Sequence, residues 1–525
     1  MERAKGIDGL LWLVLPLVVL STIPIGFVST DGLGHSRSFA SGSWRLNPNH
    51  LLFEPLGAWW QTAWTAGGRE PVDTLKLLSA LSGALAVALF RWTVAPRVAR
   101  SRWAANHATA WVACSSAFIR LWVSDETHMI QLPFVVAVAW LALVYLDRPS
   151  IGGSVALGVA VGLATLTFIS NLIIGIALGV VLSAWHLHRR ELGRAMGNAA
   201  ALALGTAGSS IPVFFLAWLF ARGEVGFFDW LTRYGGGHVP PRAMLAFGLE
   251  RSWRGLAESA IRSLYGAASS LVDLTPLAAA VRDRQAPSPE VVFGALAFVA
   301  AAATMARGLS TACAEPSRPS NRGALVLMMS WLAAIVGFGI FWNNSDDQFY
   351  FQLAPVFGVL AGRLSGRRDR AATVFLVLSL AGLCWNVFDV GAHRVFYPRH
   401  ARMALLEGEV RGACLVVYPG FDEPELLLGM SRSSASIERL AVTTLSIQYP
   451  VEEGVRALRN RIEDCRRGGG RVVLVDLFDL PPRRSPWKFL RRLGYDHAAI
   501  VRALEGFSVD RASRRVGPFT VRLVA

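Results

Sequence analysis

The sequence predicts a polytopic α-helical membrane protein with about 11 transmembrane helices, followed by a small C-terminal α/β domain outside the membrane. Of the 525 residues, 53% are hydrophobic and only 17% are charged, whereas an ordinary soluble protein carries about 25% charged residues. The apolar residues form runs long enough to cross a bilayer. From residue 391 onward the chain instead alternates short β-like runs with a helical segment. This composition excludes a cytosolic protein and a disordered one.

Eleven apolar segments are candidate spans. They are Ile7–Val28, Leu75–Ala95, Ala104–Val123, Met129–Leu146, Gly152–Ile169, Leu172–His186, Ala199–Ala221, Val291–Ala306, Ala324–Trp342, Phe349–Leu364 and Ala371–Val390. The first has no small-residue cleavage site after it, so we expect an uncleaved anchor. A single helix over 152–186 would run about 50 Å, longer than a bilayer is thick, so we divide it at Ser170-Asn171.

The placement of arginine tests this count. With a cytoplasmic N-terminus, the inner segments hold 17 Lys and Arg residues, whereas the short outer connections at 120–128, 170–171 and 343–348 hold only Arg120. Because basic loops stay in the cytoplasm, the N-terminus is predicted inside and the C-terminus outside. The formal charge of +15 is therefore explained largely by membrane topology, and we expect no nucleic-acid partner.

The chain divides into two predicted regions. Residues 1–390 form a transmembrane domain with two long outer loops, 29–74 and 222–290. The second loop contains two amphipathic stretches, Phe227–Tyr234 and Leu249–Leu271, which are typical of helices lying on a membrane surface. Residues 391–525 form the extracytoplasmic domain.

The C-terminal region shows the pattern of a small α/β domain. Three β-like runs, Ala413–Tyr418, Arg471–Asp476 and Thr520–Ala525, flank the helical segment Glu452–Arg467, which ends at a glycine run. The five cysteines form no CxxC or Cys/His motif, which excludes a zinc module and a disulfide-dense scaffold. Cys414 and Cys465 both fall in this domain and can pair in an oxidising compartment; two separately buried thiols are the alternative.

Polar and ionisable residues gather at the predicted outer helix ends, opposite the arginine-rich face. They are Asp31, His35, Arg37, Asn49, His50, Glu54, Arg120, Asp125, Glu126, His128, Ser170, Asn171, Arg233, His238 and the polar run 343–348. Ionisable groups at membrane depth are costly and usually functional. For each residue taken singly, a solvated loop position is the plain alternative.

The acids suggest proton transfer or metal binding. Asp31 ends the first span, where partial desolvation raises the proton affinity of a carboxylate, as a general base for a hydroxyl requires. The alternative is a turn aspartate before Gly32. Asp125 and Glu126 can orient an acceptor or, with Asp31, hold a divalent cation such as Mg²⁺ or Mn²⁺. No spacing motif decides whether a metal is present.

Five basic side chains suit a phosphate. Arg37, Arg120 and Arg233 can make planar, bidentate contacts with phosphate oxygens, and the alternative is that they extend to lipid headgroups. His128 and His238 can donate hydrogen bonds to the same group, although a lone histidine is more often structural.

Four strings resemble, in chain order, the GT-C glycosyltransferases. The Asp-x8-Ala-x-Gly pattern at Asp31, Ala40 and Gly42 is similar to the first outer loop of that family, and 115–120 followed by Asp125-Glu126 is similar to its second acidic loop. The segment 162–167 resembles a turn into paired short helices, and 350–362 resembles a late "Y-x-x-x-x-P…LAG" helix. The resemblance covers roughly residues 8–390. The family includes protein O-mannosyltransferases and bacterial aminoarabinose transferases.

The resemblance implies an enzyme of a bacterial inner or plasma membrane. It implies inverting transfer of a hexosyl or pentosyl group from a polyprenyl-phosphate-linked donor to a hydroxyl of a glycan, lipid or protein. Asp31 is then the general base, and the five basic residues bind the donor phosphate. Family members often carry an Asp-Glu pair in the first loop, so Gly32 after Asp31 disfavours metal binding there. No WWDYG-like string is present, which argues against an oligosaccharyltransferase.

Two other functions are compatible with a polytopic chain. The first is a transporter or flippase of lipid-linked or anionic substrates. Such proteins favour ionisable residues near the midplane and inverted repeats, whereas the acids here lie at helix ends and no repeat is visible. The second is an assembly protein whose outer domain binds a partner. Eleven spans are more than an anchor needs.

Overall fold

The structure is a computed structural model of the full chain. The residues that it describes are 10–14, 17, 30–42, 44, 46–65, 71–99, 101–115, 118–119, 122, 127–221, 226–231, 233–234, 237–238, 303, 306–314, 319–341, 352, 354–364, 384, 398–420, 424, 427–428, 437–478, 487, 490–491, 493–510 and 513–524. The chain forms two compact units. The first comprises Met1–Ile25, His35–Leu231 and Glu250–Phe396, and the second comprises Gly26–Gly34, Thr232–Leu249 and Tyr397–Ala525.

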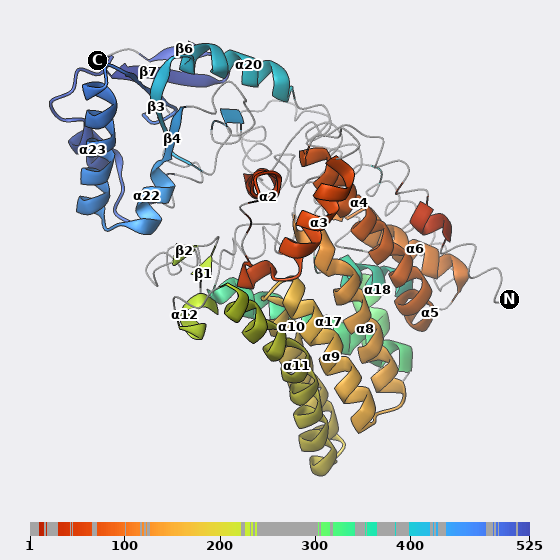
Figure 1. Ribbon diagram of the computed structural model, residues 1–525. Helices are drawn as coiled ribbons and strands as arrows, with labels where there is room; N and C mark the ends of the chain where they lie inside the picture. The colour runs from red at the N-terminus through yellow and green to blue at the C-terminus, as the bar shows by residue number, and fades with distance from the viewer. Residues whose placement is uncertain are drawn as a thin grey trace, which may run out of the picture. The chain divides into compact units, whose positions relative to one another are not determined.

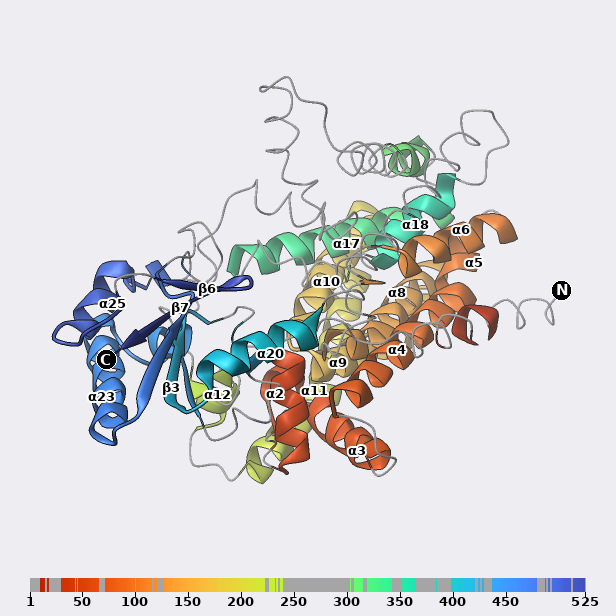
Figure 2. The same cartoon turned by 90° about the horizontal axis from the view of Figure 1, so that it is seen from above.

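The first unit contains a bundle of apolar helices (Figures 1 and 2). Its described helices are α4 (Pro71–Leu89), the π-helical turn η2 (Phe90–Val94), α5 (Ala95–Val98), α6 (Arg102–Ala113), α8 (Leu132–Asp147), α9 (Ile151–Thr167), α10 (Asn171–His188), α11 (Leu192–Phe220), α17 (Pro319–Phe341) and α18 (Ala354–Leu364). Of the described stretches, 4 are long and apolar enough to cross a membrane: Val72–Val98, His128–Asp147, Asn171–His188 and Leu192–Phe220. These apolar helices are those of an integral membrane protein, as predicted.

Three predicted spans cannot be compared with the structure. Ile7–Val28, Val291–Ala306 and Ala371–Val390 lie wholly or largely outside the described residues. The division at Ser170-Asn171 is confirmed, because α9 ends at Thr167 and α10 begins at Asn171. Between them Phe168 is extended, with φ −158° and ψ 119°, which breaks the helix.

Small residues bring α9 and α11 into close contact. A Cβ atom added to Gly158 would clash with the backbone carbonyl of Leu202, and one added to Gly205 would lie 2.5 Å from the carbonyl oxygen of Val155. The hydroxyl of Thr206 also donates to the Gly158 carbonyl at 3.1 Å. Because lipid gives helices no hydrophobic reason to associate, such backbone approach is a main source of packing energy. The glycines of α9 are therefore packing residues.

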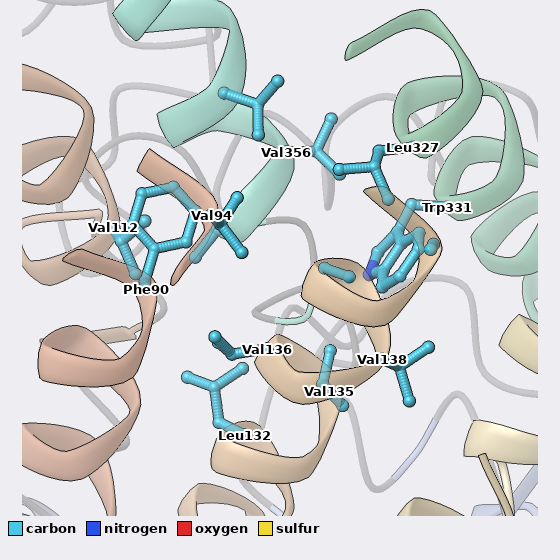
Figure 3. Close-up of a cluster of buried hydrophobic side chains, with 14 of the residues drawn as sticks. Phe90, Val94, Val112, Leu132, Val135, Val136, Val138, Leu327, Trp331 and Val356 are labelled. Atoms are coloured by element: carbon cyan, nitrogen blue, oxygen red, sulfur yellow. The ribbon is translucent and has the colours of Figure 1, made fainter. Parts of the chain in front are cut away.

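The core of the bundle lies where η2, α6, α8, α17 and α18 meet. Figure 3 shows the side chains that fill it: Phe90, Val94, Val112, Leu132, Val135, Val136, Val138, Leu327, Trp331 and Val356. Trp331 is fully buried among them. The apolar residues of these helices thus pack on each other as well as facing lipid.

The segment 29–74, which the sequence predicts as an outer connection between spans, is largely helical. It contains α2 (Thr30–Ala40), the 3-10 turn η1 (Pro48–His50), α3 (Phe53–Thr65) and the start of α4. Contacts between α2 and α3 stabilise the first of these helices. Phe39 lies 5.7 Å from the ring of Phe53, and the Gln61 side-chain amide donates to the carbonyl of Ser36 at 2.9 Å. This packing outweighs the low helix propensity of Gly32 and Gly34.

The other predicted loop, 222–290, is described only near its start. Its first amphipathic stretch forms α12 (Phe227–Leu231), followed by a short hairpin of β1 (Arg233–Tyr234) and β2 (Gly237–His238). The second stretch, Leu249–Leu271, lies outside the described residues.

The second unit is built on a five-stranded sheet in the order β4-β3-β5-β7-β6. Its strands are β3 (Ala413–Tyr418), β4 (Glu438–Ala441), β5 (Arg471–Val475), β6 (Arg514–Val516) and β7 (Phe519–Val524). β3 pairs in parallel with both β4 and β5, whereas β7 pairs antiparallel with β5 and β6. The apolar runs of β3 and β5 fit strands covered on both faces.

Helices cover both faces of this sheet. α22 (Val442–Gln448), α23 (Val451–Arg467) and α25 (His497–Leu504) pack on the face of Leu415 and Val472, and α20 (Arg399–Val410) packs on the face of Val416 and Val473. Figure 1 shows α23 beside the sheet. At the glycine run that follows α23, Gly469 adopts φ +70°. A disulfide joins Cys414 of β3 to Cys465 of α23, with Cα atoms 5.9 Å apart, so of the two alternatives for these cysteines the bonded pair is the one present.

Candidate functional site

The two ends of the helix bundle differ in chemistry. At one end Arg97 of α5 pairs with Asp147 at the end of α8, at 2.5 Å. Arg322 of α17 lies 5.3 Å from the ring of Trp185 in α10 and donates to the Leu146 carbonyl at 3.4 Å. These contacts bring the ends of three helices and the start of α17 together. We call this the arginine end.

A buried hydrogen-bond network also ties helices together at the arginine end. His186 of α10 is fully buried; its Nε2 atom lies 2.6 Å from the Tyr145 hydroxyl, and its Nδ1 atom lies 2.9 Å from a Glu191 carboxylate oxygen. The Asn198 amide of α11 lies 3.2 Å from the same Nε2 atom. The hydrogen bond with His186 and the nearby Arg189 lower the pKa of Glu191. The network joins α8, α10 and α11, and no motif in the sequence indicates it.

The opposite end carries a histidine cluster, defined as His35, His50 and His128. His35 lies on α2, His50 on η1 and His128 on the 3-10 turn η3 (Thr127–Gln131), which leads into α8. The ring centroids of His35 and His50 are 6.2 Å apart, and those of His50 and His128 are 6.1 Å apart. Because α8 begins at this cluster and ends at Asp147, the cluster and the arginine end lie at opposite ends of one membrane-crossing helix.

Local sequence fixes the position of His50. Pro48 begins η1, and the Asn47 side chain caps it by accepting a hydrogen bond from the Asn49 amide at 3.0 Å. Two backbone bonds then tie this segment to the turn between α9 and α10: the amide of Leu52 to the carbonyl of Leu166 at 3.0 Å, and the amide of Ile169 to the carbonyl of Asn49 at 3.1 Å. His50 is thereby held in place.

Aromatic rings support the cluster. The Phe168 ring lies 4.8 Å from His50 and 5.2 Å from His128, and the Phe53 ring lies 4.9 Å from His35. Phe168 comes from the break between α9 and α10, and Phe53 begins α3. The helix break therefore supplies a ring to the cluster.

Glu54 adds a buried carboxylate. Its side chain is only 4% exposed, and one of its oxygens lies 3.2 Å from Nδ1 of His35. A buried carboxylate needs such a partner, because burying a charged carboxylate without one costs much more free energy than leaving it in water. Glu54 and His35 thus form a close carboxylate–imidazole pair at this end of the bundle.

His50 is uncharged at neutral pH. Desolvation of its partly buried ring, and after that the neighbouring His128 and His35, hold the pKa of His50 well below its usual range. A neutral imidazole donates from one nitrogen and accepts at the other. His50 can thus form hydrogen bonds with an anion, but it brings no positive charge.

Three buried amides lie next to the cluster. The amide triad consists of Gln131 at the end of η3, Asn171 at the start of α10, and Gln352. Gln131 Oε1 accepts from Asn171 Nδ2 at 2.8 Å and from Gln352 Nε2 at 2.9 Å. Gln352 Nε2 also donates to Asn171 Oδ1 at 2.9 Å. None of the three side chains is more than 5% exposed.

Of the predicted site residues in the first unit, His128 and Arg37 are described. His128 is 4% exposed and belongs to the histidine cluster, whereas Arg37 is an exposed residue of α2. Arg120, Asp125 and Glu126 lie outside the described residues.

The other three predicted residues belong to the second unit. The structure places Asp31 in the first turn of α2, and its side chain lies outside what is described. The backbone brings Arg233 and His238 together, because they are register partners in the β1–β2 hairpin. Within the described residues, no group of three or more His, Cys, Asp or Glu side chains is arranged to hold a metal ion.

Six residues of this end were given no role in the sequence analysis. His35, His50, Glu54 and Asn171 were noted only as outer polar residues, and Pro48 after Asn47 was the signal that the chain turns there. Gln131 and Gln352 are isolated amides in apolar surroundings and gave a weaker signal. A buried amide in a predicted span needs a partner, which could have drawn attention to them.

Solved structures of membrane glycosyltransferases share this fold. ArnT from Cupriavidus metallidurans in the apo state matches with a TM-score of 0.52 and 15% identity, covering 99% of this chain and 98% of that chain. ArnT bound to undecaprenyl phosphate matches with a TM-score of 0.51 and 14% identity, over 99% and 97%. The Archaeoglobus fulgidus oligosaccharyltransferase AglB, in complex with an inhibitory peptide and a dolichol-phosphate, gives 0.51 and 14%, over 98% and 74%.

No protein-family model and no curated protein matches the sequence. The likeness is thus one of three-dimensional structure, extending over nearly the whole chain. It confirms the resemblance that the four strings predict: the chain has the fold of the GT-C glycosyltransferases.

Proposed function

We propose that the protein is an inverting glycosyltransferase that moves a sugar from a polyprenyl-phosphate-linked donor to an acceptor hydroxyl at the outer face of a bacterial inner or plasma membrane. The observation that carries this proposal is the GT-C fold, which matches ArnT over 99% of this chain. The histidine cluster supports it, because a polar site at one end of the bundle can bind a sugar-phosphate head whose lipid tail stays in the bilayer.

The proposed orientation puts the arginine end in the cytoplasm and the histidine cluster outside, with 11 spans in total. The Cys414–Cys465 disulfide supports the second unit being extracytoplasmic, because disulfides persist in oxidising compartments. The basic loops at the arginine end support the same orientation independently of the disulfide, because basic loops stay in the cytoplasm.

The proposed reaction is a direct displacement at the anomeric carbon. The acceptor oxygen forms a bond to that carbon, and the bond from the carbon to the donor phosphate oxygen breaks. The phosphate oxygen keeps the bonding electron pair, and the acceptor proton passes to the carboxylate of Asp31. Attack from the face opposite the phosphate inverts the configuration.

The remaining residues would bind the two substrates. His50 and His128 would donate hydrogen bonds to the departing phosphate, while Arg37, Arg120, Arg233 and His238 would be the basic groups that bind it. Asp125 and Glu126 would orient the acceptor, which is a glycan, a lipid or a protein. If a divalent cation takes part, those two carboxylates are its proposed ligands, and it would help to neutralise the phosphate.

The test is transfer by the purified protein reconstituted in lipid. Labelled polyprenyl-phosphate hexoses and pentoses are offered with acceptor fractions, and covalent transfer is measured for the wild type and Asp31→Asn. Loss of a general base should slow transfer by a factor of about 100 or more. Asp73→Asn, which changes another acid near the start of α4, is the matched control and should transfer normally. If Asp31→Asn keeps most of its rate, the assigned role is wrong.

A second measurement separates this proposal from a transporter or flippase. Proteoliposomes loaded with the same lipid-linked sugar on one leaflet report movement across the bilayer without any acceptor. Transfer that requires an acceptor and leaves free polyprenyl phosphate supports the enzyme. Movement of intact donor with no covalent product would support the transporter.

A further inference from the structure

The amide triad leaves one strong donor group without a partner. Gln131 Nε2 is buried and has no hydrogen-bond partner among the residues that the structure describes, while the whole Gln131 side chain is only 1% exposed. Buried amides are normally satisfied, because an unpaired N–H loses its bonds to water and gains none. An orphaned buried donor therefore needs an explanation.

The orientation of the Gln131 amide follows from the network. Asn171 Nδ2 donates to the backbone carbonyl of Ala164 at 2.9 Å, and a carbonyl can only accept, so this Asn171 atom must be nitrogen. The Gln131 atom that faces it at 2.8 Å must then be oxygen. Gln352 Nε2 faces two acceptors, Gln131 Oε1 and Asn171 Oδ1, which agrees with the same assignment. Flipping Gln131 would set donor against donor.

Counting the hydrogens of the three amide groups shows that only those of Gln131 have no acceptor within the triad. The two hydrogens of Asn171 Nδ2 go to Gln131 Oε1 and the Ala164 carbonyl, and the two of Gln352 Nε2 go to Gln131 Oε1 and Asn171 Oδ1. Both hydrogens of Gln131 Nε2 remain. Two neighbours thus fix the Gln131 side chain through its oxygen and leave its nitrogen available to a ligand oxygen.

The position of this donor links it to the histidine cluster. Gln131 and His128 belong to the same short turn, η3, three residues apart. Asn171 begins α10 three residues after Phe168, whose ring contacts both His50 and His128. The backbone N–H of Asn171 donates to the Phe168 carbonyl at 3.0 Å. Two members of the triad, Gln131 and Asn171, therefore lie in or beside the turns that carry His128 and Phe168.

We propose that Gln131 Nε2 donates to an oxygen of the lipid-linked donor's sugar-phosphate head, and that Asn171 and Gln352 are positioning residues that hold the Gln131 amide in this orientation. This inference rests on the proposed function. The acceptor atom is either a phosphate oxygen or a sugar hydroxyl oxygen, since both accept from a neutral amide. An amide binds either oxygen without changing the charge of the site.

The experiment uses Gln131→Glu in the purified full-length chain. Glutamate keeps the oxygen to which Asn171 and Gln352 donate and has nearly the same shape, but it replaces the N–H donors by an acceptor. Affinity for undecaprenyl phosphate, which lacks the sugar, is measured by titration in detergent, and the KM for the lipid-linked sugar is measured by transfer. Gln131→Met, which removes all polarity, is the second variant in case Gln131→Glu does not fold. Asn198→Met removes a buried amide at the arginine end and is the matched control.

The two arms identify the ligand oxygen. If it belongs to the phosphate, both Gln131 variants bind undecaprenyl phosphate about 10-fold more weakly than wild type. If it belongs to the sugar, undecaprenyl phosphate binds normally while the KM for the lipid-linked sugar rises about 10-fold. Asn198→Met should change neither value. Gln352→Met, which keeps the Gln131 donor but loosens it, should raise the same constant by a smaller factor, as a positioning role requires.

The contrary outcomes are distinct. If wild type binds undecaprenyl phosphate and transfers sugar, but both Gln131 variants stay within 2-fold of it in both assays, the inference is wrong and the proposed function stands. If Asn198→Met loses affinity as much as the Gln131 variants do, the effect is one of general stability and the inference is again wrong. Absence of binding and transfer by wild type itself overturns the proposed function and the inference with it.

Discussion

Removing the Cys414–Cys465 disulfide should lower the free energy of unfolding of the second unit by about 4 kcal/mol. The bond joins residues 51 positions apart in sequence. A crosslink removes chain entropy from the unfolded state by about 2.1 + 1.5R ln n cal/mol/K, which for a loop of this length is roughly 14 cal/mol/K, or about 4 kcal/mol at 298 K. This loss is a large fraction of the 5–15 kcal/mol by which a typical domain is stable.

The assay is pulse proteolysis of the full-length protein in detergent over a urea series, scoring cleavage within 397–525. The double variant Cys414→Ala/Cys465→Ala should be cleaved at much lower urea than wild type, and reductant should lower wild type to the same midpoint without affecting the variant. Cys313→Ala, which changes an exposed free thiol, is the control and should match wild type. A variant within about 1 kcal/mol of oxidised wild type would refute the loop-entropy reasoning.

Two further predictions concern the first unit. Because the pKa of His50 is held low in the folded state, the unfolded chain binds a proton below pH ~6.5 that the folded chain does not. His50 should therefore contribute a loss of stability of about 1.4 kcal/mol per pH unit as the pH drops below that value. In thermal denaturation at pH 7.5 and 5.5, His50→Gln should lose less stability between the two pH values than wild type does. Gly158→Leu should destabilise the bundle by about 1–3 kcal/mol, since its Cβ would meet the carbonyl of Leu202. Gly152→Leu, where nothing lies within 4 Å of an added Cβ, should melt with wild type in the same scan; equal melting of both variants would contradict the close helix contact.

The apolar runs predicted the positions of the described spanning helices and, for three of them, also their ends. Burial of backbone groups in lipid requires a helix wherever an apolar run is long enough, so α8, α9 and α10 begin and end within a few residues of the prediction. The α11 helix, by contrast, starts at Leu192 rather than at Ala199. Its first turns carry Arg194 and Asn198 and lie at the polar end, where hydropathy no longer reports helix formation.

The α2 helix, Thr30–Ala40, was missed from the sequence for a related reason. It holds Gly32 and Gly34 in its first turns and no run of apolar residues, so local propensity favours a loop there. It forms because Phe39 and Ser36 are buried against α3, a contact that no local pattern reveals. Tertiary packing decided the structure here.

The site was predicted by location better than by residue. Sorting charges by loop placed histidines and amides at one end of the bundle, and the contacts of His50 and His128 confirm that grouping. The amide triad depends on Gln131 meeting Gln352 across 221 residues of chain. Such a pairing has no signature in a single sequence, because an isolated amide looks the same whether it faces lipid, solvent or a partner.

The described part of the site is rich in hydrogen bonds and poor in charge. His50 is neutral, the amide triad is neutral, and the Glu54 carboxylate lies 3.2 Å from Nδ1 of His35. A sugar-phosphate head bound there would keep its own negative charge, so its charge has to be balanced by arginines or by a cation. Desolvated hydrogen bonds orient an anion without binding the product phosphate as tightly as fixed positive charge would. Under the proposed function, an enzyme that releases polyprenyl phosphate after every transfer would gain from that division between neutral groups that orient the head and cations that attract it.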